Sequence, residues 1–296
     1  MIQGIINAEN ENEAEVVILQ AGYEKTASSR KGTAQGPAKV IEMLDTQIEF
    51  FSRKFKKNVT DFVRTTRKNL GGLEKLSPEE TLKIISESYT ELLIKGKFVF
   101  LLGGEHSVSI GAFEALAKKY NPNEVTILQI DAHCDLRKDD SDYNENPSPL
   151  AHSTVMRHAS ELGYNLVQVG IRTYSKNEYE YFNNPKNKIT VFEWGLEQVQ
   201  VEKILDAIKT KYLYITVDVD GFDPAYMPGT GTPVPGGLAW HYGVELLEKA
   251  TEKCELIGAD IVEVSPQSET VLTEYAAAEL CYRIIAEKFK NRLIEG

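Results

Sequence analysis

Short apolar runs recur along the chain and alternate with longer stretches in which apolar residues follow helical spacing. The runs have the length of buried strands and end at Gly, Asp, Asn or other polar residues. They predict strands over residues 16–20, 59–63, 98–102, 125–130, 166–169, 188–191, 212–217 and 256–261. The stretches between them predict helices over residues 38–51, 78–93, 107–119, 154–161, 196–209, 242–252 and 271–288. Strands that alternate with helices predict an α/β fold with a mainly parallel sheet.

The alternation continues without a linker, an internal repeat or a low-complexity segment. We therefore expect a single domain over residues 1–296, with about eight strands in an open, doubly wound sheet. A barrel of eight β/α units is the structural alternative, and it too would gather functional residues at the C-terminal ends of its strands. The uneven spacing between the strands favours the open sheet.

Acidic and imidazole side chains follow the apolar run over residues 125–130. Asp131, His133 and Asp135 are separated by Ala132 and Cys134. Because side chains of an extended chain alternate between two faces, the three polar residues can converge while Ala132 and Cys134 turn into the core. Carboxylates and an imidazole are costly in a core and suit a hard metal ion, so the segment predicts a metal site.

Two more strand ends carry the same residue types. Asp218 and Asp220 lie at the end of the run over residues 212–217, and His106 follows the run over residues 98–102. In parallel α/β sheets, sites form where the C-terminal ends of the strands meet. We therefore expect these side chains to converge with Asp131, His133 and Asp135 rather than to serve as unrelated caps and loop residues.

Four aspartates and two histidines are too many ligands for one ion and fit a pair of divalent ions bridged by two carboxylates. Without metal, the clustered carboxylates would raise one another's pKa values. Oxygen and nitrogen ligands without a thiolate favour Mn²⁺ over a structural zinc ion. A two-metal centre lowers the pKa of bound water, so the sequence predicts metal-assisted hydrolysis.

Composition limits the classes of binding partner and the cellular compartment that we expect. The net charge of −11 argues against binding to nucleic acid or to an anionic membrane and mildly favours a cationic ligand. Three cysteines without a spacing motif indicate a reducing compartment. Neither a signal peptide nor a long apolar span is visible, so we expect a cytoplasmic protein.

The strand-end motifs resemble those of the ureohydrolase family of arginases and agmatinases. The matching segments are residues 103–107, 131–135, 217–224 and 228–233, and the similarity extends from Tyr23 to Pro266. The resemblance implies a three-layer α/β/α, arginase-like fold, two Mn²⁺ ions, and hydrolysis of a guanidinium group to urea and an amine. It also implies a homotrimer or a homohexamer.

The resemblance assigns a role to each candidate residue. The implied metal ligands are His106, Asp131, His133, Asp135, Asp218 and Asp220. Asp131 and Asp218 would bridge the two ions, and one histidine and one further aspartate would complete each of them.

Four residues would act on the substrate by the same resemblance. Glu263 would receive the guanidinium group, and Thr232 would line its pocket. Asp135 would pass a proton to the leaving nitrogen, and His152 would relay protons between the site and solvent. Without the resemblance, an ordinary surface histidine is the simpler interpretation of His152. Asp223 fits equally well a turn cap and a residue that holds the loop or a ligand in place.

The loop over residues 139–145 bears on the identity of the substrate. Its acidic residues would repel a carboxylate and favour a distal ammonium group, as in agmatinases; a solvated loop tip is the alternative. We therefore predict a small cationic guanidino substrate, agmatine, that is cleaved to urea and putrescine for polyamine biosynthesis. Aminopropylagmatine, arginine, a guanidino acid and formiminoglutamate remain alternatives. A non-catalytic metal-binding subunit would be expected to lack ligands that are all present here.

Overall fold

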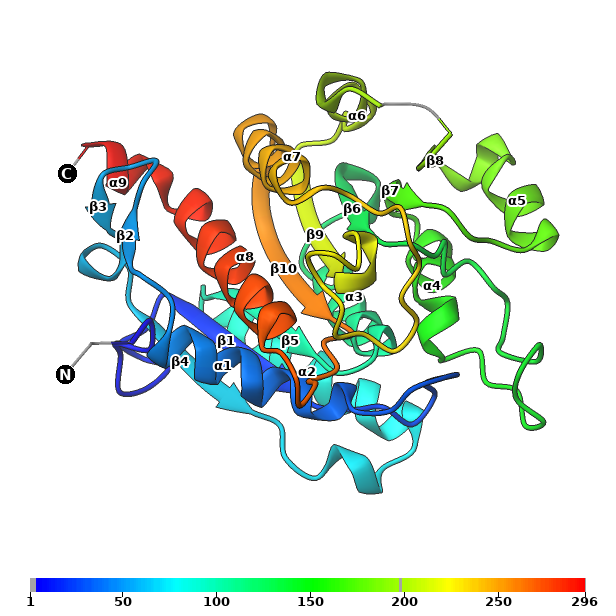
Figure 1. The fold of residues 1–296 in the computed structure, drawn as a ribbon, viewed down its shortest axis with the longest axis horizontal. Coiled ribbons are helices and arrows are strands. Elements are labelled where there is room, and N and C mark those ends of the chain that lie inside the picture. Colours follow the sequence, from blue (N-terminus) through cyan, green and yellow to red (C-terminus); the bar gives the residue numbers. More distant parts are fainter. Residues whose placement is uncertain (1–3, 197–198, 296) are drawn as a thin grey trace.

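A parallel sheet lies at the centre of the molecule, between two layers of helices (Figure 1). The computed structural model describes residues 4–196 and 199–295. Among these residues, the sheet consists of β1 (Val16–Ala21), β4 (Thr65–Asn69), β5 (Phe98–Gly103), β6 (Val125–Ile130), β7 (Asn165–Ile171), β8 (Ile189–Glu193), β9 (Tyr212–Asp218) and β10 (Glu255–Val262). The expected three-layer α/β/α fold is confirmed, and the barrel alternative is excluded because β4 and β8 are open edges.

The order of the strands brings the candidate site together. The sheet runs β4-β1-β5-β10-β9-β6-β7-β8, so the four strands that precede candidate residues are neighbours at its centre. Val217 pairs with Ile130 on one side and with Ile261 on the other. The C-terminal ends of β6, β9 and β10 are therefore level, and the residues that follow them meet at one edge of the sheet.

The two helical layers explain why the strands are continuously apolar. One layer holds α1 (Gly36–Thr46), α6 (Val201–Ala207), α7 (Trp240–Lys253) and α8 (Leu272–Lys288), and the other holds α2 (Pro78–Ile94), α3 (Ser109–Ala117) and α4 (Val155–Glu161). Along β1, Val16 and Ile18 contribute to the core on one face, whereas Val17 and Leu19 contribute to the core on the other. Both faces of the sheet are buried, as is usual for parallel sheets.

Two predicted elements differ from the structure, and two helices of the structure were not predicted. The strand expected over residues 59–63 is wrong: residues 59–61 form a 3-10 helix, and the strand is β4, whose half-exposed edge position tolerates polar residues. The helix expected over 38–51 ends at Thr46, and a hairpin of β2 (Phe51–Ser52) and β3 (Lys57–Asn58) follows. Helix α5 (Lys176–Phe182) was not expected, although Ser175 and Glu178 form a capping box at its start. The C-terminal α9 (Lys290–Glu295) was not expected either.

The remaining differences are small. The helix expected over 196–209 spans Val201–Ala207, and residues 197–198 of that prediction lie outside the described residues. Cys134 is buried in the core, as its place in the alternation predicts, and all three cysteines are free. Among the helices that the structure describes, none is long and apolar enough to cross a bilayer.

Candidate metal centre and active site

Five of the six predicted ligands form two groups that share one aspartate, and Asp218 belongs to neither group by this measure. His106, Asp131 and Asp135 each offer a ligand atom, and these atoms lie within 4.8 Å of one another. Asp131, His133 and Asp220 form a second group by the same measure. The two groups come from the ends of β5, β6 and β9, which lie at the centre of the sheet with β10 between β5 and β9. A shared carboxylate between two sets of ligands is the arrangement that a pair of ions requires.

One ring nitrogen of His106 faces three carboxylates. Its Nδ1 atom lies 3.1 Å from Asp135 Oδ2, 3.2 Å from Asp131 Oδ2 and 3.6 Å from Asp218 Oδ2. This nitrogen is buried and has no hydrogen-bond partner among the described residues. A buried, unpartnered imidazole nitrogen directed at carboxylate oxygens fits a metal ion between them.

The second group lies on the open side of the centre. His133 Nδ1 lies 3.1 Å from Asp220 Oδ2 and 3.6 Å from Asp131 Oδ1. The His133 side chain is 31% exposed, whereas those of His106, Asp131 and Asp220 are inaccessible. The centre therefore communicates with solvent past His133.

The pKa values of the candidate ligands are shifted in the way expected of a cation site. Burial and the charge of Asp131 raise the pKa of Asp135 to about 7. Burial and the charges of Asp220 and Asp131 raise the pKa of Asp218 well above its usual value. Burial disfavours a charged His133, but the carboxylates of Asp220 and Asp131 outweigh this and raise its pKa to about 11. Because these pKa values are raised, the metal-free protein holds protons at the centre. Divalent ions would neutralise the carboxylates in place of those protons.

A second layer of side chains orients the ligands, and sequence reasoning missed it. His106 Nε2 lies 2.8 Å from Thr216 Oγ1, which donates a hydrogen bond of 2.6 Å to Asp260 Oδ1. Gln129 Nε2 donates to Asp131 Oδ2 at 2.6 Å. Such contacts fix the orientation and tautomer of metal ligands. The signal in the sequence was a carboxylate, Asp260, in the middle of an apolar strand.

Glu263 follows β10 and is held against the ligand segment. Its backbone has a positive φ of 63°, and its NH donates to the carbonyl of Gly104 at 2.8 Å. Its Oε1 accepts a hydrogen bond of 2.8 Å from the backbone NH of His106. Burial and the charge of Glu105 raise the pKa of Glu263 well above its usual value. A strained backbone that places a buried carboxylate beside a candidate ligand is typical of a functional residue.

Thr232 reaches the centre from the long loop over residues 221–237. Its hydroxyl donates to Asp220 Oδ2 at 3.2 Å. Arg172, which sequence reasoning missed, donates hydrogen bonds of 2.6 Å to the carbonyls of Asp220 and Val234 and so ties the loop to the ligand segment. Asp223 holds the loop as well: its carboxylate accepts hydrogen bonds from the backbone NH groups of Ala225, Gly236 and Gly237.

His152 is linked to the ligand segment through two buried residues. Its backbone NH donates to Thr26 Oγ1 at 3.2 Å, and this hydroxyl donates to Glu105 Oε1 at 2.5 Å. Its Nε2 is buried without a hydrogen-bond partner in the described part of the chain. Burial, together with the charges of His133 and His106, lowers the pKa of His152 to about 4. His152 therefore presents a neutral imidazole with one free nitrogen.

Comparison with known proteins identifies the family. A model of the arginase family matches residues 14–286. The chain belongs to the arginase family. It is 31% identical over 281 residues to an N(1)-aminopropylagmatine ureohydrolase of Synechocystis sp., covering 92% of this chain and 89% of that protein. It is 34% identical over 260 residues to the agmatinase of Bacillus subtilis, covering 86% of this chain and 84% of that protein.

A solved structure agrees with this assignment. The agmatine ureohydrolase of Thermoplasma volcanium superimposes with a TM-score of 0.83 and 28% identity, covering 98% of this chain and 95% of that one. The chain is therefore an arginase-family ureohydrolase. The family is one of enzymes that depend on two metal ions, and the two ligand groups that share Asp131 provide candidate residues for them.

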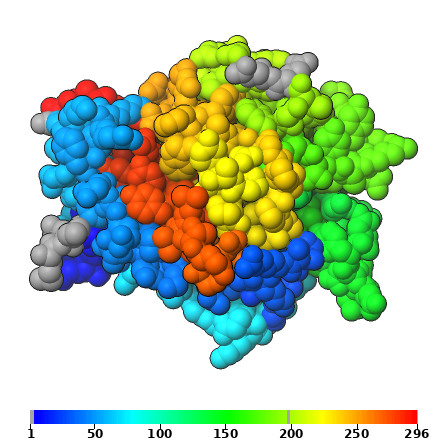
Figure 2. Space-filling view, viewed as in Figure 1, coloured from blue at the N-terminus to red at the C-terminus, as the bar shows by residue number. Residues whose placement is uncertain are grey.

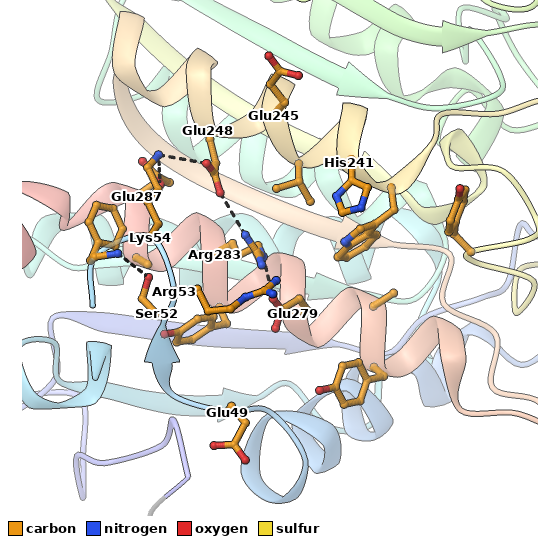
Figure 3. A pocket seen from close by; sticks show the side chains of 18 of the residues that line it. Glu49, Ser52, Arg53, Lys54, His241, Glu245, Glu248, Glu279, Arg283 and Glu287 are labelled. Atoms are coloured by element: carbon orange, nitrogen blue, oxygen red, sulfur yellow. Dashed lines mark hydrogen bonds and ion pairs between the residues drawn. The ribbon is translucent and has the colours of Figure 1, made fainter. Parts of the chain in front are cut away.

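A groove on this ureohydrolase lies away from the metal centre. This groove of about 1050 Å³ separates the β2–β3 hairpin from α7 and α8 (Figure 3). These three elements lie side by side on the face shown in Figure 2, in blue, orange and red. In the groove, Nζ of Lys54 on the hairpin lies 2.7 Å from Glu287 Oε1 and 3.1 Å from Glu248 Oε2. No candidate ligand lines it, so the groove is separate from the metal centre.

Proposed function

We propose that the chain hydrolyses the guanidinium group of agmatine to urea and putrescine, with aminopropylagmatine as the alternative substrate. The observation that carries this proposal is the pair of ligand groups that share Asp131 and that lie beside the buried carboxylate of Glu263. The names of the relatives support a guanidino substrate with a cationic chain rather than one with a carboxylate.

The proposed ligand assignment follows the two groups. His106 and Asp135 would hold one ion, His133 and Asp220 would hold the other, and Asp131 and Asp218 would be shared between them. Asp218 is included in this assignment because its Oδ2 lies 3.6 Å from His106 Nδ1 and its Oδ1 accepts a hydrogen bond from the backbone NH of Asp220, so it lies near ligands of both groups. When bound, a pair of Mn²⁺ ions lowers the pKa of water and supplies the nucleophile for hydrolysis.

The chain's own residues bind and orient the substrate. A guanidinium group is planar and charged, and a carboxylate can hold it by two parallel hydrogen bonds. We assign this role to Glu263, whose buried carboxylate gains from a cationic partner because its pKa is raised without one. Thr232 closes the same pocket from the loop, next to Asp220. Fixing the guanidinium in this way lowers the entropic cost of attack at its carbon.

Proton transfer completes the proposed reaction. Attack on the guanidinium carbon breaks its delocalisation, and the amine leaves only after its nitrogen gains a proton. Asp135 is the proposed donor, because its carboxylate lies at the centre, with Oδ2 3.1 Å from His106 Nδ1. His152 is the proposed relay, since its neutral ring has a nitrogen without a hydrogen-bond partner among the described residues and its backbone is linked through Thr26 to Glu105, next to His106.

A substrate panel tests the proposed function. Urea release by the Mn²⁺-loaded protein is measured with agmatine, aminopropylagmatine, arginine and a guanidino acid, and formamide release is measured with formiminoglutamate. We expect the highest kcat/KM with one of the two cationic amines. Preference for arginine or a guanidino acid, or formamide as the product, would overturn the proposal. The proposed trimer or hexamer is tested separately by the native mass.

A further inference from the structure

The acidic loop over residues 139–145 is held together by its own carboxylates. Asp140 is only 1% exposed, and its carboxylate accepts hydrogen bonds from the backbone NH of Ser148 and from Asn144 Nδ2. Asp142 is paired with Arg137. The buried Asp140 carboxylate therefore maintains the shape of the loop, while the Asp142 carboxylate, whose side chain is 64% exposed, offsets the charge of Arg137.

The loop presents an aromatic ring to the site. The Tyr143 hydroxyl donates a hydrogen bond to Ser153 Oγ, and its ring centroid lies 5.9 Å from that of His152. Tyr143 is 41% exposed, and its hydroxyl is fixed next to the proposed proton relay by the contact with Ser153. The backbone NH groups of Tyr143 and Asn144 both donate to the carbonyl of Asp140, so the buried Asp140 sets the position of the ring.

The charges around this ring favour a cation over an anion. Arg137 lies 5.9 Å from the ring centroid, but it is paired with Asp142 and lies 4.0 Å from Glu178. Its positive charge is thus offset by two carboxylates. Burial raises the pKa of the Tyr143 hydroxyl, and the negative charge of Asp135 also acts on Tyr143 and contributes to this rise. A partly exposed aromatic ring, beside a guanidinium group whose charge is offset by carboxylates, can attract an organic ammonium group.

We propose that Tyr143 determines substrate specificity by receiving the distal ammonium group of the substrate on its ring face, with Asp140 as the positioning residue. This inference rests on the proposed function, because it concerns the part of the substrate that extends away from the guanidinium group. In this proposal the ring of Tyr143, and not the acidic side chains of the loop, distinguishes an amine from a carboxylate. The acidic residues act indirectly, by building the loop and by offsetting Arg137.

The test compares two substrates that differ in one group. Agmatine carries the terminal amine, and butylguanidine has the same chain without it. We expect Tyr143→Leu to reduce the ratio of kcat/KM for agmatine to that for butylguanidine by roughly tenfold, through KM for agmatine. Tyr143→Phe and Tyr143→Trp keep a ring face and should retain the ratio. Asp140→Ala should lower it by releasing the loop.

A matched control is Tyr179→Leu, because Tyr179 is also an exposed tyrosine but stacks on Tyr174 at the start of α5. This variant should leave the ratio unchanged. Equal loss of activity on both substrates in Tyr143→Leu would assign Tyr143 a structural role and overturn the inference, as would an unchanged ratio. A wild-type protein that releases no urea from any guanidine would instead overturn the proposed function, so the two failures are distinguishable.

Discussion

His106 Nε2 lies 2.8 Å from Thr216 Oγ1, and this contact leaves Nδ1 to face the carboxylates of the centre. The Thr216 hydroxyl donates onward to Asp260, so it accepts from the ring and requires the proton on Nε2. We predict that Thr216→Val, which keeps the shape of the side chain, weakens Mn²⁺ binding by roughly tenfold or more. Competition with a chelator measures this affinity.

The control for that prediction is Thr126→Val. Thr126 is also a buried strand threonine, but it lies near the start of β6, and its hydroxyl contacts Thr210. Loss of affinity in both variants alike would show that the effect comes from the strands and not from the His106 tautomer.

Removal of the metal should make stability depend on pH. Without metal, the folded protein raises the pKa of Asp135 from 3.8 to about 7 and that of His133 from 6.5 to about 11. A group whose pKa is raised by folding contributes its stability below its unfolded pKa, and this stability is lost as the pH rises through its folded pKa. The chelated protein should therefore lose stability between about pH 4 and 7 through Asp135, and from about pH 6.5 upward through His133.

Thermal unfolding checks this prediction. We expect the Tm of the chelated protein to be several degrees higher at pH 6 than at pH 8.5. Because the ions displace protons from their ligands, the Tm increase produced by saturating Mn²⁺ should be larger at pH 8.5. An increase of equal size at both values of pH would contradict the raised pKa values.

Thr26 should act on catalysis through His152. It accepts the backbone NH of His152 and donates to Glu105, which directly precedes His106. We predict that Thr26→Ala lowers kcat by roughly tenfold, with a smaller change in KM and an unchanged metal content, because the relay is misplaced relative to the substrate. Thr26→Ser keeps the hydroxyl and should restore most of kcat. If metal is lost from Thr26→Ala, the residue supports the ligand segment rather than His152.

Lys54 should stabilise the fold without affecting the reaction. It joins the β2–β3 hairpin to Glu287, whose side chain is only 4% exposed. Lys54→Met would leave this carboxylate buried without its partner and should lower the free energy of unfolding by about 1–2 kcal/mol. Urea denaturation measures the change. Lys39→Met removes a half-exposed pair with Glu42 and serves as the control, with a smaller expected cost than that of Lys54→Met.

Adding Glu287→Gln to Lys54→Met should recover part of the lost stability, because the uncompensated charge is then removed. A double variant that is less stable than Lys54→Met alone would indicate that Glu287 has another role in the groove.

Local patterns determined the architecture and the ligand types. Continuous apolar runs indicated strands buried on both faces, and alternation along 131–135 separated Asp131 and His133 from Cys134, which is indeed in the core. These inferences succeeded because strand period and burial are encoded by residues that are adjacent in the sequence. The prediction over 59–63 failed because it depended on the same local signal. An edge strand such as β4 is half exposed, so its apolar signal is weak.

Only the tertiary structure decided how the site is supported. The link from Glu105 through Thr26 to His152, the clamp of Arg172 on the carbonyls of Asp220 and Val234, and the placement of Tyr143 against His152 all join distant segments. No local period relates such residues, because the order of strands in the sheet determines which loops meet. The sequence showed which chemistry gathers at the strand ends, and the packing of the loops determined which side chains surround it.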